Sequence, residues 1–175
     1  HGQLITFTYP EIGNTGVNSQ DNESSTPSVK GVIARQISKN PSNWRHQISF
    51  DKWLENENVI GIKGIDTRAL VRHLRETGTL NGLISSEPNY SISELFSVLK
   101  KSPPMSGLNL VDKVTTQHSY RVNSICPVSF DQRIKNIKKI PYKVVAIDFG
   151  IKQSILDRLV AHGCDVTILP AKATI

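Results

Sequence analysis

The sequence lacks the short motifs that identify many enzymes. Its 175 residues contain no glycine-rich phosphate loop, no Gly-x-Ser-x-Gly nucleophile turn and no His-Glu-x-x-His zinc motif. No apolar run in it approaches the roughly 20 residues that are needed to cross a bilayer. These absences argue against a P-loop nucleotide hydrolase, a serine hydrolase, a zinc peptidase and a membrane-spanning protein.

Cysteine and histidine are scarce and scattered. Neither of the two cysteines, Cys126 and Cys164, stands in a C-x-x-C spacing, so we expect no disulfide framework and no metal centre. This cysteine usage fits a protein of a reducing compartment. Cys164 precedes a strand pattern, and we expect it to be a buried apolar residue and not a nucleophile. The histidines form no spaced cluster, and no catalytic, cofactor-binding or metal-ligating residue is predicted; they are His1, His46, His73, His118 and His162.

Aromatic residues make up only 6% of the chain, which bears on the meaning of its positive charge. The formal net charge is +6, but no basic run is interleaved with stacking aromatic residues. We therefore expect a solvated basic surface, with no nucleic-acid and no membrane partner. Arg68, Arg72 and Arg75 recur at helical spacing. An anion or partner site is one interpretation, and a solvated stripe with an Arg72–Glu76 pair is favoured.

A long loop is predicted between Pro10 and Pro27, because this segment is dense in Gly, Asn, Ser and Asp. Its acidic residues Glu11, Asp21 and Glu23 suggest a cation site, but they lack the Asp-x-Asp-x-Asp-Gly order of a calcium loop. We favour the interpretation that they are solvated turn residues.

The first two thirds of the chain mix strand and helix patterns. Asp66 is a suitable N-cap for a helix over residues 67–77, which Gly78 would end. Ser91 begins a capping-box pattern that opens another helix, and Ser49 is expected to cap a short one. Strands are predicted over 4–9, 29–37 and 59–62, a turn into a strand over 79–85, and core or interface positions for Trp44 and Trp53.

The clearest pattern lies near the end of the chain. Val144–Ile147 is a wholly apolar run, typical of a strand covered on both faces. Residues 151–160 carry an apolar stripe at helical spacing, Gly163 suits the end of a helix, and Val166–Leu169 is predicted to be a second buried strand. A strand, a helix and a strand in under about thirty residues predict a parallel crossover, which is the first unit of an open α/β sheet.

Two further interpretations concern the surroundings of this crossover. Asp148-Phe149-Gly150 matches the metal-binding turn of protein kinases, but the rest of that signature is absent, so we reject a kinase site. A flavodoxin-like or receiver-type regulator leaves the preceding residues unexplained and is disfavoured. The basic segment Gln132–Pro141 is expected to be a connector, with a domain boundary near Pro141–Tyr142.

Ten dispersed blocks carry a resemblance to a known family. Residues 4–16 read Leu-Ile-Thr-Phe-Thr-Tyr-Pro-Glu-Ile-Gly-Asn-Thr-Gly, and residues 144–156 read Val-Val-Ala-Ile-Asp-Phe-Gly-Ile-Lys-Gln-Ser-Ile-Leu. Together with the other blocks, these closely resemble the small, glutamine-hydrolysing subunit of carbamoyl-phosphate synthase, in the family's order and across almost the whole chain. The other blocks are residues 21–25, 64–70, 74–78, 81–82, 107–110, 114–116, 163–164 and 170–171.

The resemblance implies an α/β protein with two domains. Residues 1–142 would be the N-terminal β/β/α domain with its connector, its start missing, and would pack against the large synthetase subunit. Residues 143–175 would be the first β-α-β unit of an open parallel-sheet class I glutamine amidotransferase domain, here truncated. In the family a Cys–His–Glu set hydrolyses glutamine. The large subunit uses the ammonia with bicarbonate, ATP and Mg to make carbamoyl phosphate for arginine and pyrimidine synthesis; the small subunit needs no cofactor.

The catalytic motifs of that family are not found in this chain. The family's Gly-x-Cys-x-Gly, Gly-Pro-Gly-Asp-Pro and His-Pro-Glu lie downstream of the Pro-Ala at 170–171, and its glutamine-contacting serine would precede His1. Cys164 matches the Gly-Cys before the second strand and not the nucleophile. We therefore expect an internal fragment that is inactive alone and exposes apolar faces of Val144–Ile147 and Val166–Leu169. The alternative is a non-catalytic binding or scaffold module for the large subunit.

The compartment is inferred from the composition of the chain and from the sequences of the blocks quoted above. Richness in Asn, Ile, Lys and Ser suggests an AT-rich genome, and the blocks are most similar to plastid-encoded or cyanobacterial-like members. We expect the plastid (chloroplast) stroma, with bacterial cytoplasm as the alternative.

Overall fold

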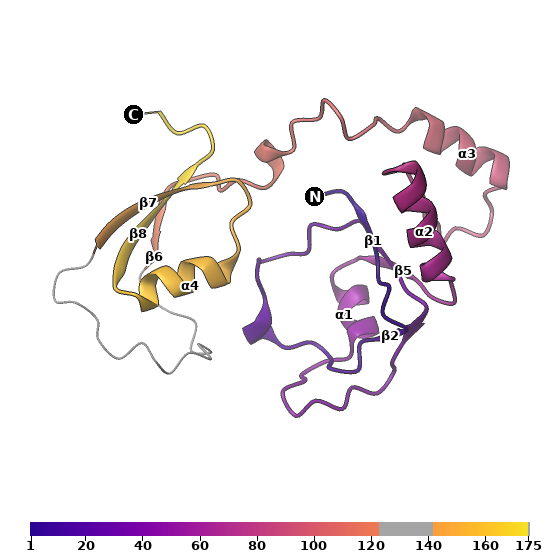
Figure 1. Cartoon of the computed structure of the whole chain (residues 1–175), viewed down its shortest axis with the longest axis horizontal. Helices are drawn as coiled ribbons and strands as arrows, with labels where there is room; N and C mark the ends of the chain where they lie inside the picture. The colour runs from indigo at the N-terminus through magenta and orange to yellow at the C-terminus, as the bar shows by residue number, and fades with distance from the viewer. Residues whose placement is uncertain (123–141, 175) are drawn as a thin grey trace. The chain divides into compact units, whose positions relative to one another are not determined.

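The computed structural model describes residues 1–122 and 142–174 and forms two compact units (Figure 1). One unit contains His1–Ser19 and Thr26–Leu108, and the other contains Gln20–Ser25 and Asn109–Ile175. The predicted connector and the boundary near Pro141–Tyr142 lie outside the described residues or at their edge, and they stay predictions. The fold is mixed α/β with parallel strand pairs.

The first unit contains two small parallel sheets. One has the order β1–β3–β5, from Leu4–Thr6, Gly31–Ile33 and Ile60–Ile62, and the other pairs β2, Glu11–Ile12, with β4, Gln36–Ile37. The strand predicted over 29–37 is therefore two strands. The chain changes sheets after Ile33, since β3 pairs with β1 and β5 whereas β4 pairs with β2.

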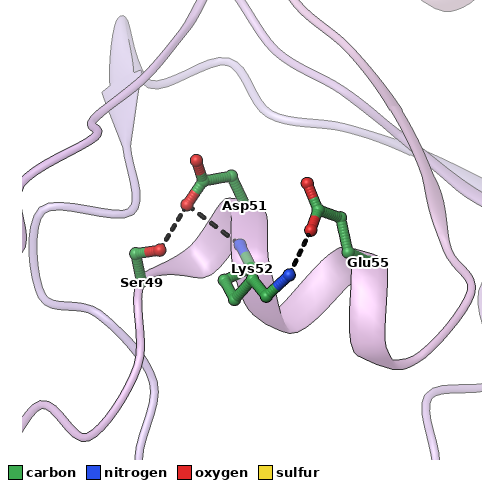
Figure 2. Close-up of polar contacts among 4 residues, drawn as sticks. All are labelled: Ser49, Asp51, Lys52 and Glu55. Carbon is green, nitrogen blue, oxygen red and sulfur yellow. Dashed lines mark hydrogen bonds and ion pairs between the residues drawn. The ribbon is translucent and has the colours of Figure 1, made fainter.

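Helix α1, Phe50–Asn56, begins directly after the predicted cap residue Ser49, but the hydrogen bonds of the cap differ from those expected (Figure 2). The Ser49 hydroxyl makes no bond to the helix backbone; it donates to Asp51 Oδ1 at 2.5 Å. That carboxylate accepts from the Lys52 backbone N–H at 2.9 Å, and Lys52 Nζ lies 2.7 Å from Glu55 Oε2 one turn later. Asp51 thus accepts the backbone N–H bond that was expected for the Ser49 hydroxyl.

Helices α2 and α3 confirm their predicted starts. In α2, Thr67–Thr77, the Asp66 side chain accepts from the Ala69 N–H at 3.0 Å, and Gly78 follows the last turn. In α3, Ile92–Lys101, Ser91 and Glu94 form both halves of the capping box. Each of these caps satisfies N–H groups that a helix leaves without an intrahelical partner.

The core of the first unit gathers around Val32, Leu54 and Val59. Trp53 packs against this cluster and stacks on Phe50, with ring centroids 5.8 Å apart, as expected of an anchor. Trp44 is 90% exposed, so it does not belong to the core, and the interface position predicted as its alternative stays a prediction. The strand predicted within 79–85 is wrong, because no other described strand pairs with that segment.

The second unit contains the predicted crossover. Strand β7, Tyr142–Asp148, runs into α4, Gln153–Ala161, and then into β8, Cys164–Pro170, which lies parallel to β7 from the Tyr142–Cys164 pair to the Asp148–Pro170 pair. Leu156 of α4 packs on Val166 and Ile168 of β8, each at most 2% exposed. Helix α4 therefore covers one face of the sheet (Figure 1).

A third strand of this sheet was not predicted. Strand β6, Tyr120–Val122, pairs antiparallel with β8, so the order among the described residues is β6–β8–β7. Arg121 Nε donates to Asp165 Oδ1 at 2.6 Å, and a second bond joins the same two side chains. The 3₁₀ turns η1 and η2 span Ser19–Asp21 and Val111–Lys113.

The two strands of the crossover differ in exposure. Val145 and Ile147 of β7 are 63% and 51% exposed, which confirms that β7 presents an apolar face. Among the described residues α4 packs only on the Val144 and Ala146 side, so coverage of the second face stays a prediction. In β8, Val166 and Ile168 are buried because α4 packs on them, so the exposure predicted for that strand does not hold at these positions.

Candidate functional site

The turn after β7 is the best-organised polar site of the second unit. Asp148 is only 6% exposed, and its carboxylate accepts three backbone N–H bonds. These come from Thr116 at 2.7 Å, Gly150 at 2.8 Å and Ile151 at 2.9 Å. Gly150 has φ +95°, a conformation that side chains rarely adopt, and it lets the chain fold back around the carboxylate.

This arrangement uses the Asp148 carboxylate for structure. Its two oxygens face backbone donors, which compensate the cost of burying a charge. Burial and then the Asp148 charge raise the pKa of the Tyr120 hydroxyl. Three of the roughly four lone-pair positions of this carboxylate accept backbone N–H bonds, which favours a structural role for Asp148.

The segment before β6 also contacts the chain at the carboxyl end of β8. The Ala171 N–H donates to Thr115 Oγ1 at 2.8 Å, beside the Thr116 bond to Asp148. Lys172 Nζ lies 2.7 Å from Asp112 Oδ2. Ligands of open α/β sheets usually bind at the carboxyl ends of the strands. Here the protein's own residues 115–116 hydrogen-bond to the chain at the carboxyl ends of both β7 and β8.

Cys164 lies at the opposite end of the sheet from Asp148. It is a free thiol at the first residue of β8, opposite Tyr142, while Asp148 pairs with the last residue, Pro170. The residue is half-buried and packs against the cluster of Leu156 and its neighbours. These contacts favour the structural interpretation of Cys164; Cys126 lies outside the described residues.

Glu23 is the acidic residue whose interpretation changes. The sequence favours a solvated turn residue, but its carboxylate accepts from the Ser154 N–H at 2.9 Å and lies 3.2 Å from Lys152 Nζ. Its backbone carbonyl accepts from the Gln153 N–H at 3.0 Å. The Ser154 N–H contributes most to holding the pKa of Glu23 below its usual value. No local pattern could have revealed a contact over 131 residues.

The remaining candidates stay apart. Within residues 1–122 and 142–174, no three His, Cys, Asp or Glu side chains gather as a metal site would require. The helices of those residues also include none long and apolar enough to cross a membrane. Arg68, Arg72 and Arg75 are exposed on α2, as a solvated stripe requires, but Arg72 forms no ion pair with Glu76 in the described structure.

Comparison with known proteins gives the family. Residues 1–84 match the family model described as the carbamoyl-phosphate synthase small chain, CPSase domain. The carbamoyl phosphate synthase small chain of Parasynechococcus marenigrum (strain WH8102) is 55% identical over 172 residues, which are 98% of this chain and 45% of that protein.

The chain belongs to the carbamoyl-phosphate synthase small-chain family.

Further relatives carry the same name. The carbamoyl phosphate synthase small chains of Synechocystis sp. (strain ATCC 27184 / PCC 6803 / Kazusa) and Pyropia yezoensis are 46% and 45% identical, over 99% and 97% of this chain. The chain spans 45% and 44% of those two proteins, so it is under half the length of these relatives. The matches extend over both compact units, well beyond the residues that the family model covers.

Proposed function

We propose that these residues form a non-catalytic part of the glutamine-hydrolysing small subunit of carbamoyl-phosphate synthase. The observation that carries the proposal is 55% identity to a carbamoyl phosphate synthase small chain over 98% of the chain. The whole small subunit releases ammonia from glutamine. The large subunit then joins the ammonia to bicarbonate in an ATP- and Mg-dependent synthesis of carbamoyl phosphate, for arginine and pyrimidine synthesis.

The parts of this chain would serve that activity without performing its chemistry. The β7–α4–β8 crossover would be the start of the amidotransferase domain, and the first unit would contact the large subunit. The exposed side chains of Val145 and Ile147 support the idea that further structure covers β7. Asp148 and Cys164, with the contacts described above, are assigned structural roles, and the catalytic Cys–His–Glu set is assigned to residues outside these 175.

A chimera tests the proposal. Residues 1–175 are joined to the remaining part of the Parasynechococcus marenigrum small chain and assayed with that organism's large subunit. We expect glutamine-dependent carbamoyl phosphate formation, and the same activity in a Cys164→Ala chimera. Residues 1–175 alone should release no ammonia from glutamine. A folded chimera without glutaminase activity contradicts the proposal, and turnover by residues 1–175 that Cys164→Ala abolishes contradicts the assignment of the thiol.

A binding or scaffold module for the large subunit is the second candidate. Helix α3 favours it, because Ile92, Phe96 and Val98 are 74%, 57% and 51% exposed and the helix has no buried residue. Titration of residues 1–175 with the large subunit measures such binding, and an Ile92→Ser/Phe96→Ser variant should weaken it. The coding DNA beyond Ile175 separates the two candidates: a stop codon favours the module, and a reading frame with Gly-Pro-Gly-Asp-Pro favours the subunit.

The proposed compartment is the plastid stroma, with bacterial cytoplasm as the alternative. Relatives from cyanobacteria and from the red algae Pyropia yezoensis and Porphyra purpurea support this choice. Mapping the gene to a plastid or a bacterial genome decides between the two.

A further inference from the structure

Helix α4 lacks an N-cap of its own. The residue at its cap position is Lys152, whose side chain makes no bond to the helix backbone, and the first turn contains no acidic residue. The first N–H groups of a helix have no intrahelical acceptor, and a cation at this end opposes the helix dipole. The start of α4 is therefore poorly specified by its local sequence.

Glu23 supplies the hydrogen-bond acceptors that the local sequence at the start of α4 lacks. Its side chain and its backbone carbonyl accept from two successive N–H groups, those of Ser154 at 2.9 Å and Gln153 at 3.0 Å. The same carboxylate lies 3.2 Å from Lys152 Nζ, so it also neutralises the unfavourable charge. Backbone and side-chain contacts together place residue 23 as a two-point cap, 131 residues away in sequence from Ser154.

We propose that residues 20–25 are a strap that caps α4 from a distance, so that the order of α4 depends on the strap being docked. The segment leaves the first unit after Ser19, joins the second unit and returns to the first at Thr26. Leu156, one turn into α4, is 2% exposed in the core of the second unit. Fraying of the first turn of α4 would therefore loosen the packing of Leu156 in that core. This inference does not rest on the proposed function.

The ion pair of the strap is partly exposed to solvent. The Glu23 and Lys152 side chains are 42% and 60% exposed, so water and salt reach the ion pair, and the backbone bonds carry most of the specificity. The charged group beside the carboxylate is Lys152 on α4. Asp157 is engaged elsewhere on α4, where it accepts from Gln153 Nε2 at 2.9 Å.

Amide hydrogen exchange of the whole 175-residue chain tests the strap. In a Glu23→Ala variant, which removes the side-chain acceptor, we expect the Ser154 amide to exchange about fivefold faster, the size typical of a lost N-cap, while amides of α2 stay unchanged. Glu87→Ala is the matched control, since it removes an exposed carboxylate of the first unit that accepts no bond in the described structure. It should change neither helix.

Two further measurements keep the test decisive. Lys152→Gln removes the ion pair but leaves the cap, so it should change Ser154 exchange by less than about twofold. In the unmodified chain, the chemical shift of the Ser154 amide should follow the titration of the Glu23 carboxyl, which requires no variant to fold. Ser154 exchange that is equal in Glu23→Ala and the unmodified chain, or a Ser154 chemical shift that does not follow the carboxyl titration, overturns the proposal.

Discussion

Gly31 occupies the centre of the β1–β3–β5 sheet, where two neighbouring strands leave no room for a side chain. A Cβ at this position would lie 2.9 Å from Leu4 Cδ2, 3.1 Å from Ile60 Cγ2 and 3.2 Å from the Ile60 carbonyl oxygen. The last of these is backbone, which cannot move aside as a methyl group can. The requirement for glycine here comes from close approach and not from an unusual φ.

Gly31→Ala should therefore lower the free energy of unfolding of the first unit by about 1–3 kcal/mol, the usual cost of overpacking. Trp53 lies against that core, so its fluorescence in a urea titration measures the change. Gly82→Ala is the control, because its Cβ would meet one Leu4 methyl group at 3.2 Å and no other atom within 4 Å. A midpoint for Gly31→Ala that equals that of Gly82→Ala would show that β1 and β5 are not so tightly spaced.

Asp148 concentrates three hydrogen bonds on one buried carboxylate. In Asp148→Asn one acceptor oxygen becomes an N–H₂ donor that faces backbone N–H groups, so we expect a loss of about 2–3 kcal/mol in the second unit. Hydrogen exchange of Ile168, at the centre of that core, reports the loss. Asp157→Asn, which affects a single bond on the surface of α4, should cost far less. Equal protection of Ile168 in both variants would contradict the structural role of Asp148.

Comparison of α2 with α4 shows what sequence can predict at the level of the element. Both ends of α2 were predicted to the residue, because Asp66, the apolar stripe and Gly78 are all local signals. The existence of α4 was predicted from its stripe, but its cap was not, since Glu23 is 131 residues from Ser154. A cap that forms only after folding leaves no pattern in a short window.

Strands, like helices, were predicted where the signal is local and missed where it depends on distant residues. Strands β7 and β8 were predicted from the apolar residues within Val144–Ile147 and Val166–Leu169. Strand β6 has only three residues, of which Tyr120 and Arg121 are exposed. Its pairing is specified by β8 and by the Arg121–Asp165 contact, which no window around residue 120 contains. The exposure of Trp44 has the same origin: aromatic character predicts burial, but only neighbours decide it.

Helix α4 should become less stable in acid. The folded-state pKa of Glu23 lies below its ordinary value of 4.5, chiefly because of the Ser154 N–H, so this contribution is present above pH 4.5 and is lost as the pH falls through the folded-state pKa. Asp165 follows the same sign through Arg121. Ser154 exchange relative to Ile168 exchange, compared between about pH 6 and about pH 3.5, should accelerate in the unmodified chain but not in Glu23→Gln. Parallel behaviour of the two proteins would contradict this assignment.

At the scale of the whole molecule, apolar surface remains open on both units. Val145 and Ile147 on β7, and Ile92 and Phe96 on α3, are all at least half exposed. Contiguous apolar surface of this kind marks interaction sites or aggregation-prone faces. The positive charge of +6 opposes self-association only partly, since salt screens it.

Val145→Thr/Ile147→Thr should therefore raise the solubility of the chain and lower its binding of a hydrophobic dye such as ANS. The substitution keeps β-branched side chains on a strand and removes one methyl group from Val145 and an apolar branch from Ile147, so the sheet should persist. Light scattering and dye fluorescence measure the effect, and circular dichroism verifies the fold. Dye binding and scattering at unmodified levels would show that β7 is not the adhesive surface.

The strap makes the order of synthesis matter. A ribosome produces residues 20–25 long before α4, and at 5–20 residues per second the intervening 131 residues take on the order of ten seconds. During that interval the first unit can close around its own core while Glu23 has no helix to cap. The nascent chain should be open to protease between Ser19 and Thr26 until Ser154 has left the exit tunnel. In this protein, an early segment waits for a late one.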